Sequence, residues 1–337
     1  MTATQLHKPL IAVLGAGAWG TALSVLLARN GHPVLLWATD ARRLERLAHE
    51  GTDVAGISGL RLPSGVETRA DLAATLRDTR HFLIAVPSHA FRATLQRLGS
   101  PEKGAIVAWA TKGLEPGSGK LLSDVAAEVV GGTPLAVLSG PTFAGEIARG
   151  LPAALTVAAT DMQTAEHVAG WLRNDRVRVY TSDDLRGVQL GGAIKNVMAI
   201  AAGISDGLGF GANARAALVT RGLAELVRLG VAMGGKRETF MGLAGAGDLI
   251  LTCTDNASRN RRVGLGLGQG RNLKEILTEI GQEAEGVATA RELYRLAQRV
   301  NVEMPITEQV YRVLYENLSP HAAVEALLRR DPRPEAV

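Results

Sequence analysis

Two charged side chains stand in stretches of sequence that are otherwise apolar. Lys195 lies in a predicted helix at residues 185–203, and apolar side chains cover nearly the whole circumference of that helix. Asp248 lies in the apolar stretch 242–254. Because a buried lysine or carboxylate needs a partner, we expect the two groups to pair. The pair is either a structural ion pair or a catalytic lysine that an aspartate positions and tunes.

Residues 15–20, GAGAWG, have the spacing G-x-G-x-x-G between a predicted strand at 10–15 and a predicted helix at 21–30. In this motif Gly15 permits the tight turn, Gly17 lets the backbone approach a pyrophosphate, and Gly20 lets the helix pack closely on the strand. The N-terminus of the helix offers free N–H groups to the phosphates. The motif therefore predicts a dinucleotide site.

The end of the second predicted strand bears on which dinucleotide binds. An acid at this place binds the ribose 2′-hydroxyl of NAD, whereas a nearby arginine accommodates the 2′-phosphate of NADP. Here Asp40 is either that acid or the cap of the next helix. Arg42 and Arg43 follow, and they either hold a phosphate or are solvated. The sequence leaves NAD(H) and NADP(H) both open.

Three further predicted strands end in small or polar residues. These ends are VPSH at 86–89, ATKG at 110–113 and SGPTFA at 139–144. Ligands bind beyond the carboxyl ends of the strands in open α/β sheets, so we expect these segments to lie beside the glycine turn. Lys112 is either a solvated loop lysine or a cation beside the cofactor phosphates and a substrate anion.

A second anion site is indicated by the polar, basic segment 254–262, TDNASRNRR. Asn256 or Ser258 can cap the helix that follows, which leaves free N–H groups beside Arg259 and Asn260. The alternatives are a nucleic-acid patch or a solvated basic run. Aromatic residues are only 4% of the chain, and this disfavours binding by base stacking. A small phosphate is the preferred ligand, and no nucleic-acid partner is expected.

The composition limits the possible classes of protein. A chain of 337 residues with 46% hydrophobic and 21% charged residues is typical of a globular protein with about two domains. One cysteine, Cys253, excludes an intramolecular disulfide and fits a reducing compartment. The seven histidines have no metal-ligand spacing, so we expect no metal. No run of about 18 apolar residues occurs, so we expect no membrane span.

The order of predicted elements indicates the architecture. In the first part of the chain short apolar strands alternate with helices, which favours a doubly wound, Rossmann-type parallel sheet. The predicted strands are 10–15, 33–38, 81–87, 105–110, 134–140, 153–159 and 177–180, and the helices between them are 21–30, 41–49, 71–77, 90–98, 120–130 and 164–173. After these, only helices are predicted, at 185–203, 212–233, 243–254, 258–268, 272–280, 286–300 and 305–317. We therefore predict an α/β chain with a dinucleotide-binding domain at 1–185, a helical substrate-binding and catalytic domain at 186–330, and a frayed tail at 331–337.

Several segments resemble those of bacterial NAD(P)-dependent sn-glycerol-3-phosphate dehydrogenases. They are GAGAWGTAL (15–23), VPSHAF (86–91), WATKGLE (109–115), SGPTFAGE (139–146), GVQLGGAIKN (187–196), SDGLGFGANARAALVTRGL (205–223), GLAGAGDLILTCTDNASRNRR (242–262) and EMPITEQVY (303–311). The resemblance implies the reversible reduction of dihydroxyacetone phosphate to glycerol 3-phosphate, the backbone of phospholipids. It also implies that Lys195 donates and accepts the proton, and that the enzyme is a cytoplasmic homodimer.

The resemblance and the motifs together predict three groups of residues. The catalytic group is Lys195, Lys112 and Asp248. The substrate group is Lys112, Gly140, Thr142, Lys195, Asn196, Asp248, Ser258, Arg259 and Asn260. The cofactor group is Gly15, Gly17, Ala18, Trp19, Gly20, Thr39, Lys112, Ala144, Arg259, Glu283 and Glu285. Many members of the family carry a basic residue near the position of Thr39, so this departure leaves the preference between NADPH and NADH open.

Two alternative functions remain open from the sequence. A dinucleotide-sensing regulator without turnover would keep Gly15, Gly17 and Gly20 but does not need a lysine and an aspartate in apolar segments. A 3-hydroxy-acid or 6-phosphogluconate type dehydrogenase also joins such a sheet to a helical domain and uses a lysine. The predicted anion site at 258–260 favours a phosphate ester over a simple hydroxy acid, although phosphogluconate also fits it.

Overall fold

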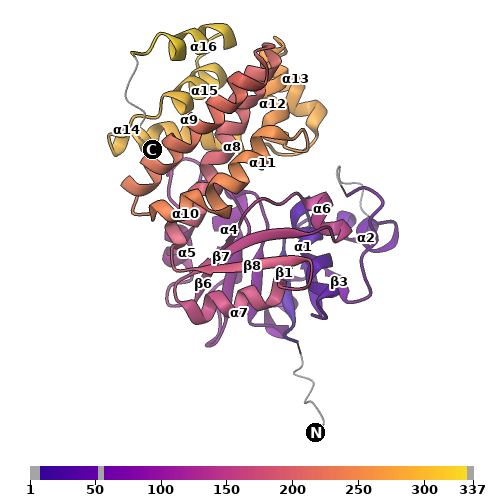
Figure 1. The fold of residues 1–337 in the computed structure, drawn as a ribbon. Helices are drawn as coiled ribbons and strands as arrows, with labels where there is room; N and C mark the ends of the chain where they lie inside the picture. The colour runs from indigo at the N-terminus through magenta and orange to yellow at the C-terminus, as the bar shows by residue number, and fades with distance from the viewer. Residues whose placement is uncertain (1–7, 52–56, 332–337) are drawn as a thin grey trace.

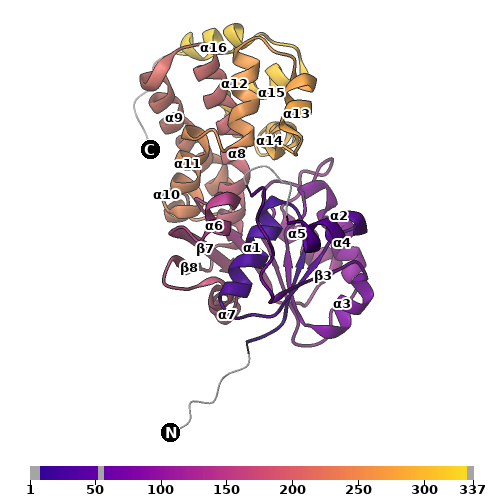
Figure 2. The ribbon, with the colours of Figure 1, turned by 90° about the vertical axis from the view of Figure 1, so that its right-hand side faces the viewer.

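The computed structural model describes residues 8–51 and 57–331 (Figure 1). A sheet flanked by helices forms the N-terminal part, and a helical body is stacked on one end of it (Figures 1 and 2). This arrangement agrees with the predicted fold class. Residues 332–337 of the predicted tail lie outside the described residues.

An eight-stranded sheet organises the N-terminal part, in the order β3-β2-β1-β4-β5-β6-β7-β8. Its strands are β1 Ile11–Leu14, β2 Val34–Trp37, β3 Val66–Arg69, β4 His81–Ile84, β5 Ile106–Trp109, β6 Leu135–Ser139, β7 Ala153–Ala159 and β8 Val177–Ser182. The order 3-2-1-4-5-6 is that of dinucleotide-binding sheets, with β1 and β4 at the point where the direction of winding reverses.

Two details of the sheet correct the prediction. β7 runs antiparallel to β6, with Ser139 opposite Thr156, so the sheet is mixed rather than wholly parallel. The apolar pattern of a strand buried on both faces carries no information on its direction. The prediction also omits β3, because its residues VETR are polar and only partly buried at the edge of the sheet.

Both faces of the sheet are covered by helices. They are α1 Ala18–Arg29, α2 Ala41–His49, α3 Leu72–Asp78, α4 Ser88–Leu98, α5 Leu122–Val129, α6 Ala144–Arg149 and α7 Met162–Leu172. Ile11 and Val13 belong to the core under α1 and α7, whereas Ala12 and Leu14 belong to the core under α4 and α5. This alternation along β1 is the period of two expected for a strand between two helical layers. The six-residue helix α6 is absent from the prediction because its apolar pattern is too short to recognise.

After β8 the described residues form helices and the turns between them. The helices are α8 Leu185–Gly207, α9 Gly211–Ala232, α10 Arg237–Met241, a π-helix at Leu243–Gly247, α11 Asp248–Thr254, α12 Arg259–Gly268, α13 Leu273–Ile280, α14 Glu285–Arg299, α15 Pro305–Tyr315 and α16 Pro320–Leu328. The prediction omits α10, which is short, and α16. It also merges the π-helix with α11.

The central helix α8 joins the two cores. Val188 near its start packs in the core of the sheet under α4 and α5, whereas Leu190 and the apolar residues that follow form the core of the helical part. Among the described residues, α8 is the one helix long and apolar enough to span a membrane. The whole of its apolar window is buried inside the protein, so α8 is a core helix.

Candidate active site

Two lysines and one aspartate form the centre of the site. Lys195 Nζ on α8 donates to Asp248 Oδ1 at 2.6 Å, and Lys112 Nζ, just beyond β5, donates to Asp248 Oδ2 at 2.6 Å. The Asp248 side chain is completely buried, and the side chains of Lys195 and Lys112 are 8% and 16% exposed. The predicted pairing of Lys195 with Asp248 is confirmed. The structure adds Lys112 to the same carboxylate.

Each lysine has a further acceptor that fixes its direction. Lys195 Nζ donates to Thr252 Oγ1 at 2.7 Å, and Lys112 Nζ donates to the carbonyl oxygen of Gly140 at 3.3 Å. Thr252 is absent from the predicted site. Its spacing of four residues from Asp248 on one helix places both on the same face, and this spacing is the signal that would have found it.

Burial and charge tune the central lysine. Burial lowers the pKa of Lys195 to about 8, with Asp248 acting to raise it and Lys112 to lower it further. Burial alone would raise the pKa of Asp248, but the two ammonium groups outweigh that effect and hold it below its ordinary value. The aspartate is therefore ionised, and Lys195 can both release and accept a proton near neutral pH.

Two adjacent glycines of α8 let the three charged groups meet. A Cβ atom on Gly191 would lie 2.3 Å from the carbonyl oxygen of Ala244, in the π-helix that leads to Asp248. A Cβ atom on Gly192 would lie 2.8 Å from Ser139 Oγ and 3.4 Å from Lys112 Cγ. A side chain at either position would hold the strand ends or the π-helix away from Lys195. The two glycines therefore allow Ser139, Lys112 and the π-helix to approach α8 beside Lys195.

The glycine turn after β1 has the geometry of a dinucleotide site. Gly15 has a φ of 124°, and a Cβ atom there would lie 2.6 Å from the carbonyl oxygen of Ala85. A Cβ atom on Gly20 would lie 1.8 Å from the carbonyl oxygen of Gly15, so this close packing requires glycine. Gly17 is the N-cap of α1, and a Cβ atom there would meet nothing within 4 Å. The open space ahead of Gly17 and the free N–H groups of α1 suit a pyrophosphate.

Asp40 follows the end of β2 and makes a capping contact there. Asp40 Oδ1 accepts a hydrogen bond from the backbone N–H of Arg43 at 3.1 Å, so Asp40 caps α2. Thr39 and Arg42 are exposed beside it. The capping interpretation of Asp40 therefore holds.

The predicted second anion site falls at the start of α12. Ser258 is the N-cap, and its Oγ accepts from the backbone N–H of Arg261 at 3.2 Å. The first N–H groups of a helix have no partner inside the helix, so those of Arg259 and Asn260 are available to an anion. The side chain of Asn260 accepts from the backbone N–H of Gly286 at 2.9 Å, which ties α12 to the start of α14.

Asn196 lies close to the same junction. A Cβ atom on Gly286 would lie 2.6 Å from the carbonyl oxygen of Asn196 and 2.8 Å from Asn260 Oδ1. The residue after Lys195 therefore borders the segment of the predicted anion site. Thr142 belongs to the sheet part and lies just beyond β6. Its hydroxyl donates to the carbonyl oxygen of Gly140 at 3.2 Å.

Glu283 and Glu285, both members of the predicted cofactor group, connect the start of α14 to the start of α4. Glu283 Oε1 lies 3.1 Å from His89 Nδ1. Burial raises the pKa of Glu285 to about 8 and Glu283 raises it further, although Arg259 and Ser88 oppose the shift. Burial also lowers the pKa of Arg259, against the opposing charges of Glu285 and Glu283. Glu285 also borders the segment after β5, since a Cβ atom on Gly113 would lie 3.1 Å from Glu285 Oε2.

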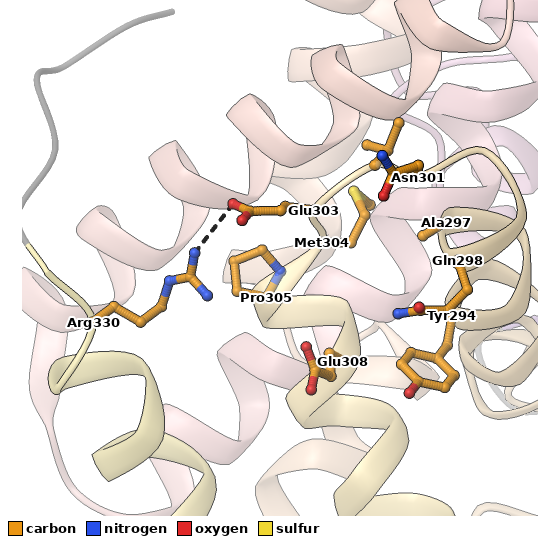
Figure 3. Close-up of a pocket in the computed structure, with 10 residues that line it drawn as sticks. Tyr294, Ala297, Gln298, Asn301, Glu303, Met304, Pro305, Glu308 and Arg330 are labelled. Atoms are coloured by element: carbon orange, nitrogen blue, oxygen red, sulfur yellow. Dashed lines mark hydrogen bonds and ion pairs between the residues drawn. The ribbon is translucent and has the colours of Figure 1, made fainter.

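A separate hollow of about 240 Å³ lies between α14, α15 and Arg330 (Figure 3). It is lined by Tyr294, Ala297, Gln298, Asn301, Val302, Glu303, Met304, Pro305, Glu308 and Arg330. None of the predicted site residues is among them. Across residues 8–51 and 57–331, no cluster of three or more histidine, cysteine or acidic side chains has the arrangement of a metal site.

Comparison with known proteins identifies the family. Residues 10–165 match the model of the N-terminus of NAD-dependent glycerol-3-phosphate dehydrogenase, and residues 184–325 match the model of its C-terminus. The chain is 56% identical over 332 residues to the glycerol-3-phosphate dehydrogenase (NAD(P)+) of Thioalkalivibrio sulfidiphilus, with 98% of this chain and 100% of that one covered. The chain belongs to the NAD-dependent glycerol-3-phosphate dehydrogenase family.

Other relatives and solved structures agree with this membership. The glycerol-3-phosphate dehydrogenase (NAD(P)+) of Nitrosococcus oceani is 56% identical over 325 residues, or 96% of this chain and 94% of that one. The crystal structure of glycerol-3-phosphate dehydrogenase from Coxiella burnetii is 46% identical, has a TM-score of 0.93, and is matched over 96% of this chain and 100% of that one. Membership of this family favours glycerol-3-phosphate dehydrogenase activity over the two alternatives, a dinucleotide-sensing regulator and a 6-phosphogluconate type dehydrogenase.

Proposed function

We propose that the chain catalyses the reversible reduction of dihydroxyacetone phosphate to sn-glycerol 3-phosphate. The product is the backbone of phospholipids. The observation that carries the proposal is the pairing of a buried and a partly buried lysine on one buried aspartate, at the sheet edge that also holds the glycine turn. NAD(H) or NADP(H), when bound, supplies or accepts the hydride.

The proton in this reaction is assigned to Lys195. In the direction of reduction, its ammonium group gives a proton to the C2 carbonyl oxygen as the carbon receives hydride, and the carbonyl becomes a hydroxyl. Lys195 is left as the neutral amine, and in the reverse direction it takes the hydroxyl proton back. A pKa of about 8 makes both protonation states accessible near neutral pH.

Lys112 and Asp248 support this proton transfer. Asp248 holds both ammonium groups at 2.6 Å, which fixes the direction of Lys195 Nζ and keeps it charged despite its burial. Lys112 adds a second positive charge beside the carbonyl oxygen, where negative charge develops as hydride arrives. Lys112 also lies between the ends of β5 and β6, where it can contact both substrate and cofactor.

The phosphate of the substrate is assigned to the start of α12. The N–H groups of Arg259 and Asn260, the Arg259 guanidinium and the Ser258 cap supply the donors that a phosphate needs. Thr142 and Gly140 border the site from the sheet, and Asn196 borders it from α8. The cofactor is assigned to Gly15, Gly17, Ala18, Trp19, Gly20, Thr39 and Ala144 on the sheet side and to Glu283, Glu285 and Arg259 on the helical side.

We also propose a cytoplasmic homodimer. Large apolar side chains of the helical part are exposed, with Phe210 at 43%, Met241 at 49% and Ile250 at 54%, and they support an interface there. The single cysteine, Cys253, is buried and free, as expected in a reducing compartment. Light scattering of the purified protein tests the dimer, and a monomer at micromolar concentration would reject it.

The reaction is tested by following nicotinamide absorbance with dihydroxyacetone phosphate, with NADH and NADPH supplied separately. We expect turnover with this substrate and much slower turnover with unphosphorylated dihydroxyacetone. 6-Phosphogluconate and 3-hydroxybutyrate, with the oxidised cofactors, serve as control substrates. Faster turnover with either of them would reject the proposed substrate.

A further inference from the structure

We propose that Arg261 is a positioning residue that sets the start of α12, and with it the phosphate site, against the helices that carry Lys195 and Asp248. The inference rests on the proposed function, because it concerns the same phosphate site. Arg261 is not among the predicted site residues. In the sequence it is one of several basic residues in the segment 254–262.

The guanidinium of Arg261 connects three parts of the helical body. Its Nε donates to the carbonyl oxygen of Cys253 at 3.0 Å, at the end of α11. Its Nη1 donates to Asn256 Oδ1 in the turn between α11 and α12, and its Nη2 donates to Asp206 Oδ2 near the end of α8. Arg261 is only 6% exposed; its contact to Cys253 is buried, and those to Asn256 and Asp206 are partly buried.

The backbone of α12 is already held against α8 beside this side chain. A Cβ atom on Gly203 would lie 2.1 Å from the carbonyl oxygen of Arg261, and one on Gly264 would lie 2.0 Å from the carbonyl oxygen of Ile200. The two helices therefore meet backbone to backbone at Arg261. The side chain of Arg261 extends this fixed contact to the segment 253–257, which leads into Ser258 and the anion site.

Arginine is the side chain that can make this connection. Its planar guanidinium offers donors in several directions at once, whereas a lysine ammonium acts as a single compact charge. The carboxylate of Asp206 does not depend on Arg261 alone, because Arg215 Nη1 also donates to Asp206 Oδ1 and Oδ2 at 3.0 and 2.9 Å. Loss of Arg261 therefore frees the turn without leaving Asp206 unpaired.

This geometry predicts a selective effect on substrate binding. Arg261 does not contact the Lys195–Asp248–Lys112 group in the structure, so the proton transfer keeps its groups. A displaced α12 start, however, misaligns the N–H groups and the Arg259 guanidinium that face the phosphate, and small displacements of positioning groups are costly. We expect Arg261→Gln to raise the KM for dihydroxyacetone phosphate by about 10-fold or more while kcat changes by less than about threefold.

The experiment compares Arg261→Gln with Arg215→Gln, which removes the other arginine on the same carboxylate but no contact to the turn. Steady-state kinetics give KM and kcat, and thermal unfolding with and without inorganic phosphate reports the phosphate site directly. In Arg215→Gln we expect a lowered melting temperature with unchanged KM and the wild-type gain in melting temperature on adding phosphate. In Arg261→Gln we expect this gain to be lost.

Two further variants keep the test decisive if Arg261→Gln does not fold. Arg261→Lys retains a charge for Asp206 but cannot also hold Cys253 and Asn256, so it should restore stability while KM stays high. Asn256→Ala removes only the contact of Arg261 Nη1 to the turn, so it should raise KM in the same direction but by less.

Wild-type KM in folded Arg261 variants, or an equal rise of KM in Arg215→Gln, would overturn the positioning role. Absence of turnover with dihydroxyacetone phosphate in the wild type would instead overturn the proposed function.

Discussion

Replacing Asp248 by asparagine should shift the pH dependence of the reaction, because Asp248 is the one group that holds both lysines. Asparagine keeps the shape of the side chain and removes its charge. The buried Lys195 and the partly buried Lys112 then lie close together with no negative charge between them. The protonated form of Lys195, which donates the proton during reduction, becomes less stable.

The magnitude follows from the geometry. Each lysine nitrogen lies 2.6 Å from a carboxylate oxygen, and at an effective dielectric constant of about 20 one such contact corresponds to roughly 6 kcal/mol of attraction. Removing one partner of a buried pair costs about 3–5 kcal/mol once relaxation is included. If the protonated form of Lys195 is destabilised by about 3 kcal/mol, reductive activity falls off at a pH about two units lower than in the wild type. At pH 7.5 reduction should therefore fall by roughly 10- to 100-fold.

The assay is kcat/KM for dihydroxyacetone phosphate between pH 5.5 and 10, for the wild type and Asp248→Asn. Glu225→Gln is the matched control, since Glu225 is also a buried carboxylate, only 2% exposed, that accepts from the backbone N–H groups of Ile306 and Thr307. This control should lose stability but keep the wild-type pH profile. An Asp248→Asn profile that overlays the wild type would refute the reasoning, because the aspartate would then not tune Lys195.

Three further predictions concern single groups. In the wild type, the pKa of about 8 for Lys195 means that kcat/KM for reduction falls as pH rises past about 8, while oxidation of glycerol 3-phosphate speeds up over the same range; flat profiles from pH 6 to 10 would contradict the assignment. Arg259→Ala should raise the KM for the phosphate ester by the equivalent of about 1.5–3 kcal/mol, and an unchanged KM would place the phosphate elsewhere. Because burial raises the pKa of Glu285 to about 8, its carboxyl stays protonated in the folded protein while the unfolded chain ionises, so stability falls as pH rises from about 5 to 8. Glu285→Gln removes that loss, so its melting temperature should match the wild type at pH 5 and exceed it at pH 8. A melting temperature equal to that of the wild type at both pH 5 and pH 8 would contradict the raised pKa of Glu285.

Local patterns in the sequence predicted much of the fold and the centre of the site. Apolar runs that alternate with helical patterns located seven of the eight strands. Most of them are buried on both faces and therefore apolar throughout, whereas the edge strand β8 was located by its alternating apolar residues Val177 and Val179. The edge strand β3 lacks this burial and therefore the signal. Lys195 and Asp248 stood out because charges are costly in apolar segments.

Contacts between distant segments could not be predicted in the same way. Lys112 shares the carboxylate of Asp248 across 136 residues, and nothing local to Lys112 distinguishes it from a solvated loop lysine. The turn contacts of Arg261 depend on where α8, α11 and α12 meet. The antiparallel direction of β7 depends on the path of the chain after β6 rather than on its own residues.

The most direct test of the account is the variant Lys195→Met, which fills the same buried space without a proton to give. The rate of reduction of dihydroxyacetone phosphate is measured beside the dissociation constant for NADH and NADPH, obtained by fluorescence titration. A positioned general acid contributes about 10²–10⁴-fold, so we expect a loss of that size with cofactor affinity close to the wild type. Turnover within about threefold of the wild type would contradict the assignment of the proton to Lys195.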